Sequence, residues 1–187
     1  NTGLYRASAQ AAQYRHFTGR NSVVMVYLWP SAANLLGYGT DSRHARTSAP
    51  AFARLLELVA DHTSAENINI LAYSAGAQIV SPALDILGRR MAPHQRQRLR
   101  LGQLYFAAGD IGVNTFVEHM LSFVDIPSST TVAMNRKDSV LALAAWREKV
   151  SRIGRPNLAD LNEQEQRQVQ AAASHSKLAI IEVSPET

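Results

Sequence analysis

Residues 67–90, NINILAYSAGAQIVSPALDILGRR, change from a strand pattern to a helix pattern with no linker between the two. The run 67–73 is typical of a buried strand, and the residues after it carry apolar side chains at helical spacing. The junction falls at Ser74, with Ala72 two residues before it and Gly76 two residues after it. A strand that turns directly into a helix holds its pivot residue in a strained backbone conformation and favours small residues at those two positions. This stretch is therefore restricted to a strand–turn–helix corner.

The rest of the chain alternates in the same way between short apolar runs and helical patterns. This alternation indicates an α/β fold, with a mostly parallel sheet and helices on both faces. A chain of 187 residues without repeats or a long linker fits one domain, so we expect a single domain over 1–187. We expect strands over residues 22–29, 67–73, 103–108, 130–135 and 177–184. We expect helices over residues 3–17, 48–62, 76–90, 115–123, 141–150 and 161–173. Ser48 is expected to cap the second of these helices, with Pro50 in its first turn, and Pro82 is expected to kink the third. Asn114 is expected to cap the fourth, and a capping box of Asp160 and Glu163 is expected to begin the last.

The composition, with 46% hydrophobic and 18% charged residues, is that of a globular chain. The longest apolar run, VVMVYLW, is far shorter than the roughly 20 residues that cross a bilayer, so we expect no transmembrane segment. The net charge is +4, and the arginines between residues 89 and 100 have no interleaved aromatic residues, so we expect no nucleic-acid partner. The chain has no cysteine, which excludes disulfides, a thiolate metal site and a cysteine nucleophile, and we expect no metal and no cofactor. The compartment, cytoplasm or cell envelope, and the oligomeric state stay open.

A serine at a strand–turn–helix corner is typical of a catalytic nucleophile. Such a corner presents the hydroxyl of Ser74 at the carboxyl edge of the sheet, where ligands bind in parallel α/β folds. The backbone N–H of Ala75, at the start of the helix, can face an oxyanion that develops on a substrate. The alternative is an ordinary turn with an incidental serine, because small residues and serine are common.

Two aspartates and two histidines follow strands and so belong to the same edge as the nucleophile. Asp110 follows the strand after the nucleophile, and Asp138 follows the strand after that. Either could orient a histidine, and either could equally be a loop cap or turn residue. His44 and His119 are the alternative bases within the chain, although the order Ser, Asp, His places the base after the last strand, where only PET remains. The other histidines precede strands and are expected at the opposite edge, about 20 Å away; we exclude His16, His62, His94 and His175 on this ground.

Four stretches of the sequence resemble a bacterial branch of the α/β-hydrolase superfamily whose members were long catalogued as hydrolases of unknown function. They are VVMVYLWPSAANLLGYGTDSRHARTSAPAFARLL, the elbow AYSAG, FAAGDIGVNTF and AMNRKDSVLALA, and the WPS is part of the most specific one. Members of that branch have an HSMG-type nucleophile elbow, so Tyr73 stands where histidine is usual and Ala75 where methionine is frequent. They also carry a strand ending in HGYN before the first helix and a histidine shortly after the last strand. The resemblance implies that this strand and its oxyanion loop lie upstream of residue 1 and the base downstream of Thr187.

The resemblance implies a serine hydrolase of esterase, lipase or thioesterase type that acts on a small-molecule ester or thioester. Asp138 is favoured as the acid because α/β-hydrolases most often carry it two strands beyond the nucleophile, and Asp110 holds a less frequent alternative position. Trp29, Ser31 and Tyr73 would line the substrate pocket, although Trp29 is equally consistent with a core residue. Without the base and the upstream oxyanion donor, the 187 residues are expected to be nearly inactive.

Two other classes of function remain open. One is a non-catalytic binding or scaffold protein that keeps the hydrolase fold. The other is an anion or nucleotide binder at the helix N-terminus after Ala75, which the absence of a glycine-rich phosphate loop makes less favourable.

Overall fold

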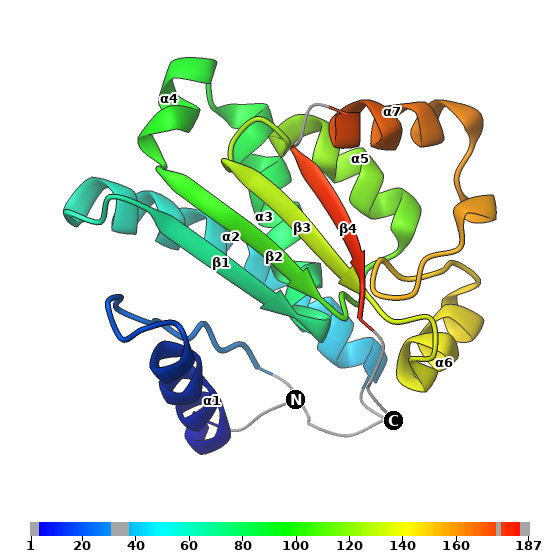
Figure 1. Ribbon diagram of the computed structural model, residues 1–187, viewed down its shortest axis with the longest axis horizontal. Helices are drawn as coiled ribbons and strands as arrows, with labels where there is room; N and C mark the ends of the chain where they lie inside the picture. The colour runs from blue at the N-terminus through cyan, green and yellow to red at the C-terminus, as the bar shows by residue number, and fades with distance from the viewer. Residues whose placement is uncertain (1–3, 31–37, 175–176, 184–187) are drawn as a thin grey trace. The chain divides into compact units, whose positions relative to one another are not determined.

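The computed structural model describes residues 4–30, 38–174 and 177–183 (Figure 1). The chain divides into two compact units, residues 1–48 and residues 49–187, which are described separately below. The expectation of a single domain over 1–187 stays a prediction.

The first unit contains helix α1 (Leu4–Phe17), which confirms the expected helix. The strand expected at 22–29 is wrong, because residues 21–30 adopt no regular structure and Val23 is 92% exposed. A strand is held by hydrogen bonds to a neighbouring strand, and the described part of this unit contains no other strand that could supply them.

Helix α2 (Tyr38–His62) begins in the first unit and ends in the second. It starts ten residues before the expected position, so Pro50 lies inside the helix and not in its first turn. Ser48 is not the cap that we expected: its hydroxyl donates to the carbonyl of His44 at 2.8 Å, one helical turn back. A serine that bonds to the preceding turn is compatible with a helix interior, and this local bond explains why the start was misplaced.

The second unit is built on a four-stranded sheet in the order β1-β2-β3-β4. All three neighbouring pairs are parallel, so the carboxyl ends of the strands share one edge. This confirms the expected α/β architecture with a parallel sheet. The strands are β1 (Ile68–Tyr73), β2 (Leu101–Ala107), β3 (Ser129–Met134) and β4 (Leu178–Glu182).

Helices α3 (Ala77–Arg90) and α5 (Val113–Phe123) lie together behind the sheet in Figure 1. The core between sheet and helices includes Phe106, Phe116 and Phe123, which meet edge to face at centroid distances of 5.1 and 6.3 Å. Helix α3 runs unbroken past Pro82. On the face of the sheet covered by α3 and α5, the apolar residues of the sequence pattern therefore form the core.

The other face of the sheet is more open in the described residues. On β1, Ile70 and Ala72 are buried, whereas Leu71 and Tyr73, on the opposite face of the strand, are 48% and 66% exposed. Ile180 on β4 is 47% exposed. Among the described helices, α3 and α5 pack on the face that holds the aromatic core, and α7 (Glu163–Ser174) contacts β4.

The remaining elements are connections and their caps. Asn114 is not the cap of α5, which begins after Gly112 without a side-chain cap. The capping box of α7 is formed by Asn162 and Glu165, with bonds of 2.9 and 2.8 Å, two residues after the expected pair. The remaining elements of the second unit are α4 (Pro93–Arg98), α6 (Ser139–Glu148), the 3-10 turn η3 (Leu158–Asp160) and α7 (Glu163–Ser174). The sequence did not predict α4.

Candidate active site

Ser74 is the first residue of a 3-10 turn, η2 (Ser74–Gly76), that links the end of β1 directly to α3. Its φ is 50°, in the left-handed region that residues with a Cβ rarely adopt. The side chain is partly exposed, and the residue stands at the carboxyl edge of the parallel sheet. The expected strand–turn–helix corner with a strained pivot is therefore present in the structure.

The two small residues around the pivot differ in their surroundings. Ala72 is 1% exposed, so a larger side chain there would have to displace packed atoms. Gly76 has φ −58°, and a Cβ added to it would meet no atom of the described chain within 4 Å. The expected steric demand is thus met at Ala72 and is not found at Gly76. The N–H of Ala75 is one of the first donors of the helical segment, which have no partner inside a helix.

Asp110 lies beside the pivot but is already engaged by other groups. Its backbone N–H donates to the carbonyl of Ser74 at 3.0 Å. Its carboxylate forms an ion pair with Arg152, Oδ1 to Nε 3.2 Å, and accepts from the amide of Gln78 at 3.4 Å. Asp110 and Arg152 are both almost completely buried. The carboxylate therefore holds an arginine, not a histidine, in the described structure.

Asp138 is the N-cap of α6. Its Oδ1 accepts a hydrogen bond from the N–H of Leu141 at 2.9 Å, and the residue is partly exposed. The capping role that the sequence left open is thus present. A capping carboxylate keeps a second oxygen, so this bond does not by itself exclude a partner histidine.

Of the two in-chain candidates for the base, only His119 lies in the same unit as Ser74, and it contacts another serine. His119, on α5, has its Nδ1 3.0 Å from the hydroxyl of Ser81 on α3. Ser81 is two helical turns beyond Ser74, which corresponds to about 10 Å along the axis. Burial lowers the pKa of His119, and the nearby carboxylates of Asp85 and Glu118 oppose that shift. His44 lies in the unit of residues 1–48, and its buried Nδ1 has no hydrogen-bond partner among the described residues.

The comparison with protein families agrees with this geometry. Residues 2–184 match the family described as "Alpha/beta hydrolase of unknown function (DUF900)". The chain belongs to this α/β-hydrolase family. Comparisons with curated proteins and with solved structures gave no match. The family match and the parallel sheet together establish an α/β-hydrolase-like fold, whereas the nucleophile assignment and the bacterial branch stay predictions.

The residues expected to line the substrate pocket of this hydrolase-family chain are described one by one, because they belong to two separate units. Tyr73 is the last residue of β1 and its side chain is largely exposed. Trp29 lies in the first unit, partly buried, and its buried indole N–H has no hydrogen-bond partner among the described residues. Ser31 is outside the described residues. The substrate pocket therefore stays a prediction.

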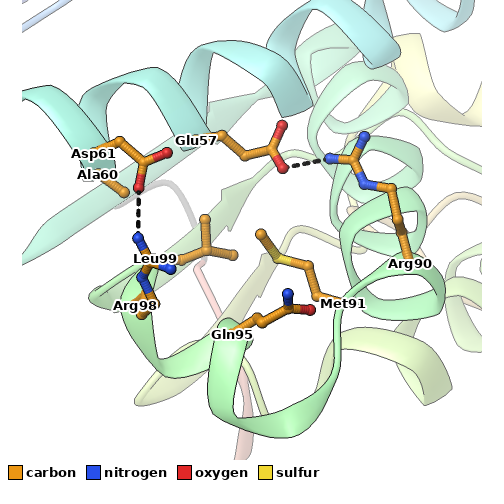
Figure 2. Close-up of a pocket in the computed structure, with 8 residues that line it drawn as sticks. All are labelled: Glu57, Ala60, Asp61, Arg90, Met91, Gln95, Arg98 and Leu99. Atoms are coloured by element: carbon orange, nitrogen blue, oxygen red, sulfur yellow. Dashed lines mark hydrogen bonds and ion pairs between the residues drawn. The ribbon is translucent and has the colours of Figure 1, made fainter.

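The hydrolase-family chain has a hollow of about 330 Å³ at the edge of the sheet opposite to Ser74. Figure 2 shows Met91 and Leu99 in its wall, and two ion pairs beside them. Arg90 reaches Glu57 at 2.6 Å, and Arg98 reaches Asp61 at 3.4 Å. The charges in this hollow are matched within the protein. It also lies away from the carboxyl edge where ligands bind in parallel sheets, so we do not assign it to the active site.

Sequence reasoning missed the groups that hold the carboxyl edge in place. Arg152 lies between the helices expected at 141–150 and 161–173, where the sequence predicts an irregular loop. Gln78 lies in the helix expected at 76–90, and the helical pattern does not tell whether its amide is buried or at the surface. The sequence around Arg152 does not reveal that its charge becomes buried when the chain folds. The burial of Asp110, which is seen only in the fold, is what requires a partner of opposite charge.

No helix in the described stretches combines the length and the apolar character needed to cross a membrane.

Proposed function

We propose that this chain is a serine hydrolase that acts on ester or thioester bonds, with Ser74 as the nucleophile. The observation that carries the proposal is the φ of 50° at Ser74, at the junction between β1 and the following helix. Backbone strain at a partly exposed, nucleophilic side chain is retained where it serves a function. Membership of an α/β-hydrolase family supports the same interpretation.

In the proposed reaction the Oγ of Ser74 attacks the carbonyl carbon, and its proton passes to a histidine base. The negative charge on the carbonyl oxygen is stabilised by the N–H of Ala75 together with a second donor. The intermediate collapses to an acyl-enzyme, and the leaving alcohol or thiol takes the proton from the histidine. Water, deprotonated by the same histidine, then attacks the acyl-enzyme and releases the carboxylic acid.

Asp138 is the proposed acid that orients the base. The carboxylate of Asp110 is already occupied by Arg152 and Gln78, whereas Asp138 uses one oxygen for the cap of α6 and is partly open to solvent. A second hydrogen bond, from a histidine N–H to the other oxygen, is compatible with this geometry. Asp138 is therefore still preferred to Asp110 as the acid, as the sequence had indicated.

Within the second unit, His119 bonds to Ser81 and not to Ser74 or to these aspartates. We therefore expect slow turnover from these 187 residues, since a triad without one member retains about 10³ to 10⁴ over water. The same observation favours a second candidate function, a binding or scaffold protein that keeps the fold without turnover.

Ester hydrolysis distinguishes the two functions. We would assay the purified protein with p-nitrophenyl esters of increasing acyl length and compare Ser74→Ala with Ser64→Ala, which replaces an exposed serine in a loop before β1. A hydrolase loses its ester turnover in Ser74→Ala and retains it in Ser64→Ala. Equal rates in the native protein and in Ser74→Ala would support the binding or scaffold function instead.

A further inference from the structure

A second hollow, of about 530 Å³, lies beyond the carboxyl end of β3. It is formed by the turn after β3, the end of α6 and the loop that follows, all within the unit 49–187. Its volume is within the range of small-molecule sites. It also opens at the edge of a parallel sheet where ligands bind. It is lined by Arg136, Ala145, Lys149, Val150, Ser151, Arg155, Pro156, Asn157 and Asp160.

The wall of this hollow is fixed by backbone hydrogen bonds. The N–H of Asn135 donates to the carbonyl of Gly154 at 2.8 Å, and the N–H of Gly154 donates to the carbonyl of Gly109 at 2.9 Å. A Cβ on Gly154 would come within 2.5 Å of the carbonyl carbon of Ala108, so the loop packs closely against the end of β2. The loop is therefore held in place by the protein alone, and its side chains are presented by a formed frame.

The lining carries three cations and one carboxylate. Asp160 is the carboxylate, and its Oδ2 accepts from the N–H of Ser151 at 2.7 Å while the Asn157 amide lies 3.5 Å from its Oδ1. These local donors already solvate its charge, so Asp160 pairs with none of the lining cations. The carboxylate of Asp160 shapes the loop and compensates none of the three positive charges of the lining.

Two of the three cations have no ion-pair partner among the described residues. Arg136 forms an ion pair with Glu182 of β4, Nε to Oε2 3.4 Å. Arg155 donates its Nε to the backbone carbonyl of Arg136 at 2.8 Å, which orients the guanidinium and leaves its terminal nitrogens as further donors. Lys149 ends α6 with φ 57° and is exposed. An oriented guanidinium beside a lysine provides donors suited to a planar or tetrahedral oxyanion.

We propose that this hollow binds the anionic group, phosphate or carboxylate, of a small-molecule ligand, with Arg155 and Lys149 as its main contacts. The proposal does not depend on the role of Ser74, because it rests on a different set of side chains. It assigns a binding site for negative charge to the carboxyl edge of the sheet, the same edge that carries the corner at Ser74.

Isothermal titration calorimetry of the protein with inorganic phosphate, and separately with succinate, tests the proposal at constant ionic strength. We expect saturable binding of at least one of these anions, and about a tenfold loss of affinity in Lys149→Gln and in Arg155→Gln. Arg155→Lys retains the charge and should lose less. The matched control is Lys137→Gln, which removes an exposed cation next to Arg136 that does not line the hollow.

Each outcome decides the proposal. Binding of phosphate alone or succinate alone supports the site and identifies the preferred anion. No saturable binding of either anion overturns it, as does a loss in Lys137→Gln equal to that in Lys149→Gln, since that indicates general charge screening. If Arg155→Gln does not fold by circular dichroism, the exposed Lys149 and the Arg155→Lys variant still give the comparison.

Discussion

The φ of 50° at Ser74 is a cost that the fold must offset. A side chain with a Cβ in the left-handed region is less stable by about 1–2 kcal/mol than in the right-handed region. Glycine has no such penalty. The residue at this position is therefore not the one that stability alone would select, which is why the strain is informative about function.

Replacing Ser74 tests this strain directly. We predict that Ser74→Gly is more stable than Ser74→Ala by about 1 kcal/mol, because both lack the hydroxyl but only alanine keeps the Cβ. The free energy of unfolding in urea would be measured for both variants, with Ser64→Gly and Ser64→Ala as the matched pair at an unstrained loop position. If glycine at position 74 is less stable than alanine, as it is at ordinary positions, the strained pivot is absent.

Burial between α3 and α5 lowers the pKa of His119. The carboxylates of Asp85 and Glu118 act in the opposite direction and raise this pKa, whereas the charge of Arg89 lowers it further. Because the folded pKa lies below the unfolded value of about 6.5, the unfolded chain binds more protons in the interval between the two values. Stability is then fully present above about pH 6.5 and falls as the pH drops through that interval.

We therefore predict that His119→Gln flattens the pH dependence of unfolding below about pH 6.5. The measurement is the urea midpoint of the native protein and the variant across that range, with His94→Gln as the control because His94 is exposed. An unchanged slope in His119→Gln would mean that another group causes the pH dependence.

At the scale of elements, the contact between α3 and α5 depends on a glycine. A Cβ on Gly88 would lie 2.0 Å from the carbonyl oxygen of Ser122, and this neighbour is backbone, which cannot rotate away. The two helices can therefore approach only while position 88 has no side chain. Gly76, in the turn after the nucleophile, has open space in the described structure.

Alanine at the two glycines should have opposite effects. We predict that Gly88→Ala lowers the free energy of unfolding by about 1–3 kcal/mol, although alanine is the better helix former by about 1 kcal/mol. Gly76→Ala should be neutral or slightly stabilising. Thermal or urea unfolding of both variants checks this, and a neutral Gly88→Ala would show that α3 and α5 are less closely packed than described.

Apart from the short helix α4, the elements of the second unit could be predicted because each depends on its own periodicity. The run 67–73 and the run 22–29 are both apolar, but only the first finds a neighbouring strand in the described structure. Apolar character predicts that a segment can be a strand and does not say which strand pairs with it. The start of α2 was misplaced for a similar reason, since a serine that bonds to the turn before it looks like a cap in sequence.

At the scale of the molecule, the buried pair of Asp110 and Arg152 links the corner at Ser74 to the loop that follows α6. Asp110 donates its N–H to Ser74, and Arg152 also reaches Glu148 at 2.8 Å. Removing one member of a buried pair leaves the other charge without compensation, which costs about 3–5 kcal/mol.

We predict that Asp110→Asn and Arg152→Met each destabilise the protein by about 3 kcal/mol, and that the double variant loses clearly less than the sum. Urea unfolding of the two single variants and the double variant gives the coupling. Arg167→Gln, which breaks an exposed pair with Glu163, should cost at most about 0.5 kcal/mol. Additive losses at Asp110 and Arg152 would mean that the two side chains act independently.

The candidate site was only partly predictable because some of its contacts join residues that are far apart in the sequence. Ser74 could be found because its neighbours in sequence create its geometry. The partner of Asp110 could not, because 42 residues separate it from Arg152 and only the fold brings them together. The base also depends on residues far apart in the sequence, and His119, the candidate within the second unit, contacts Ser81 and not Ser74.

The most direct test of the central claim is the site of covalent modification by a fluorophosphonate probe, which reacts with activated serines. We predict that peptide mapping of the labelled native protein finds the adduct on Ser74, and that labelling disappears in Ser74→Ala and persists in Ser64→Ala. An adduct that persists unchanged in Ser74→Ala, or one that maps to another serine of the native protein, would rule out Ser74 as the nucleophile.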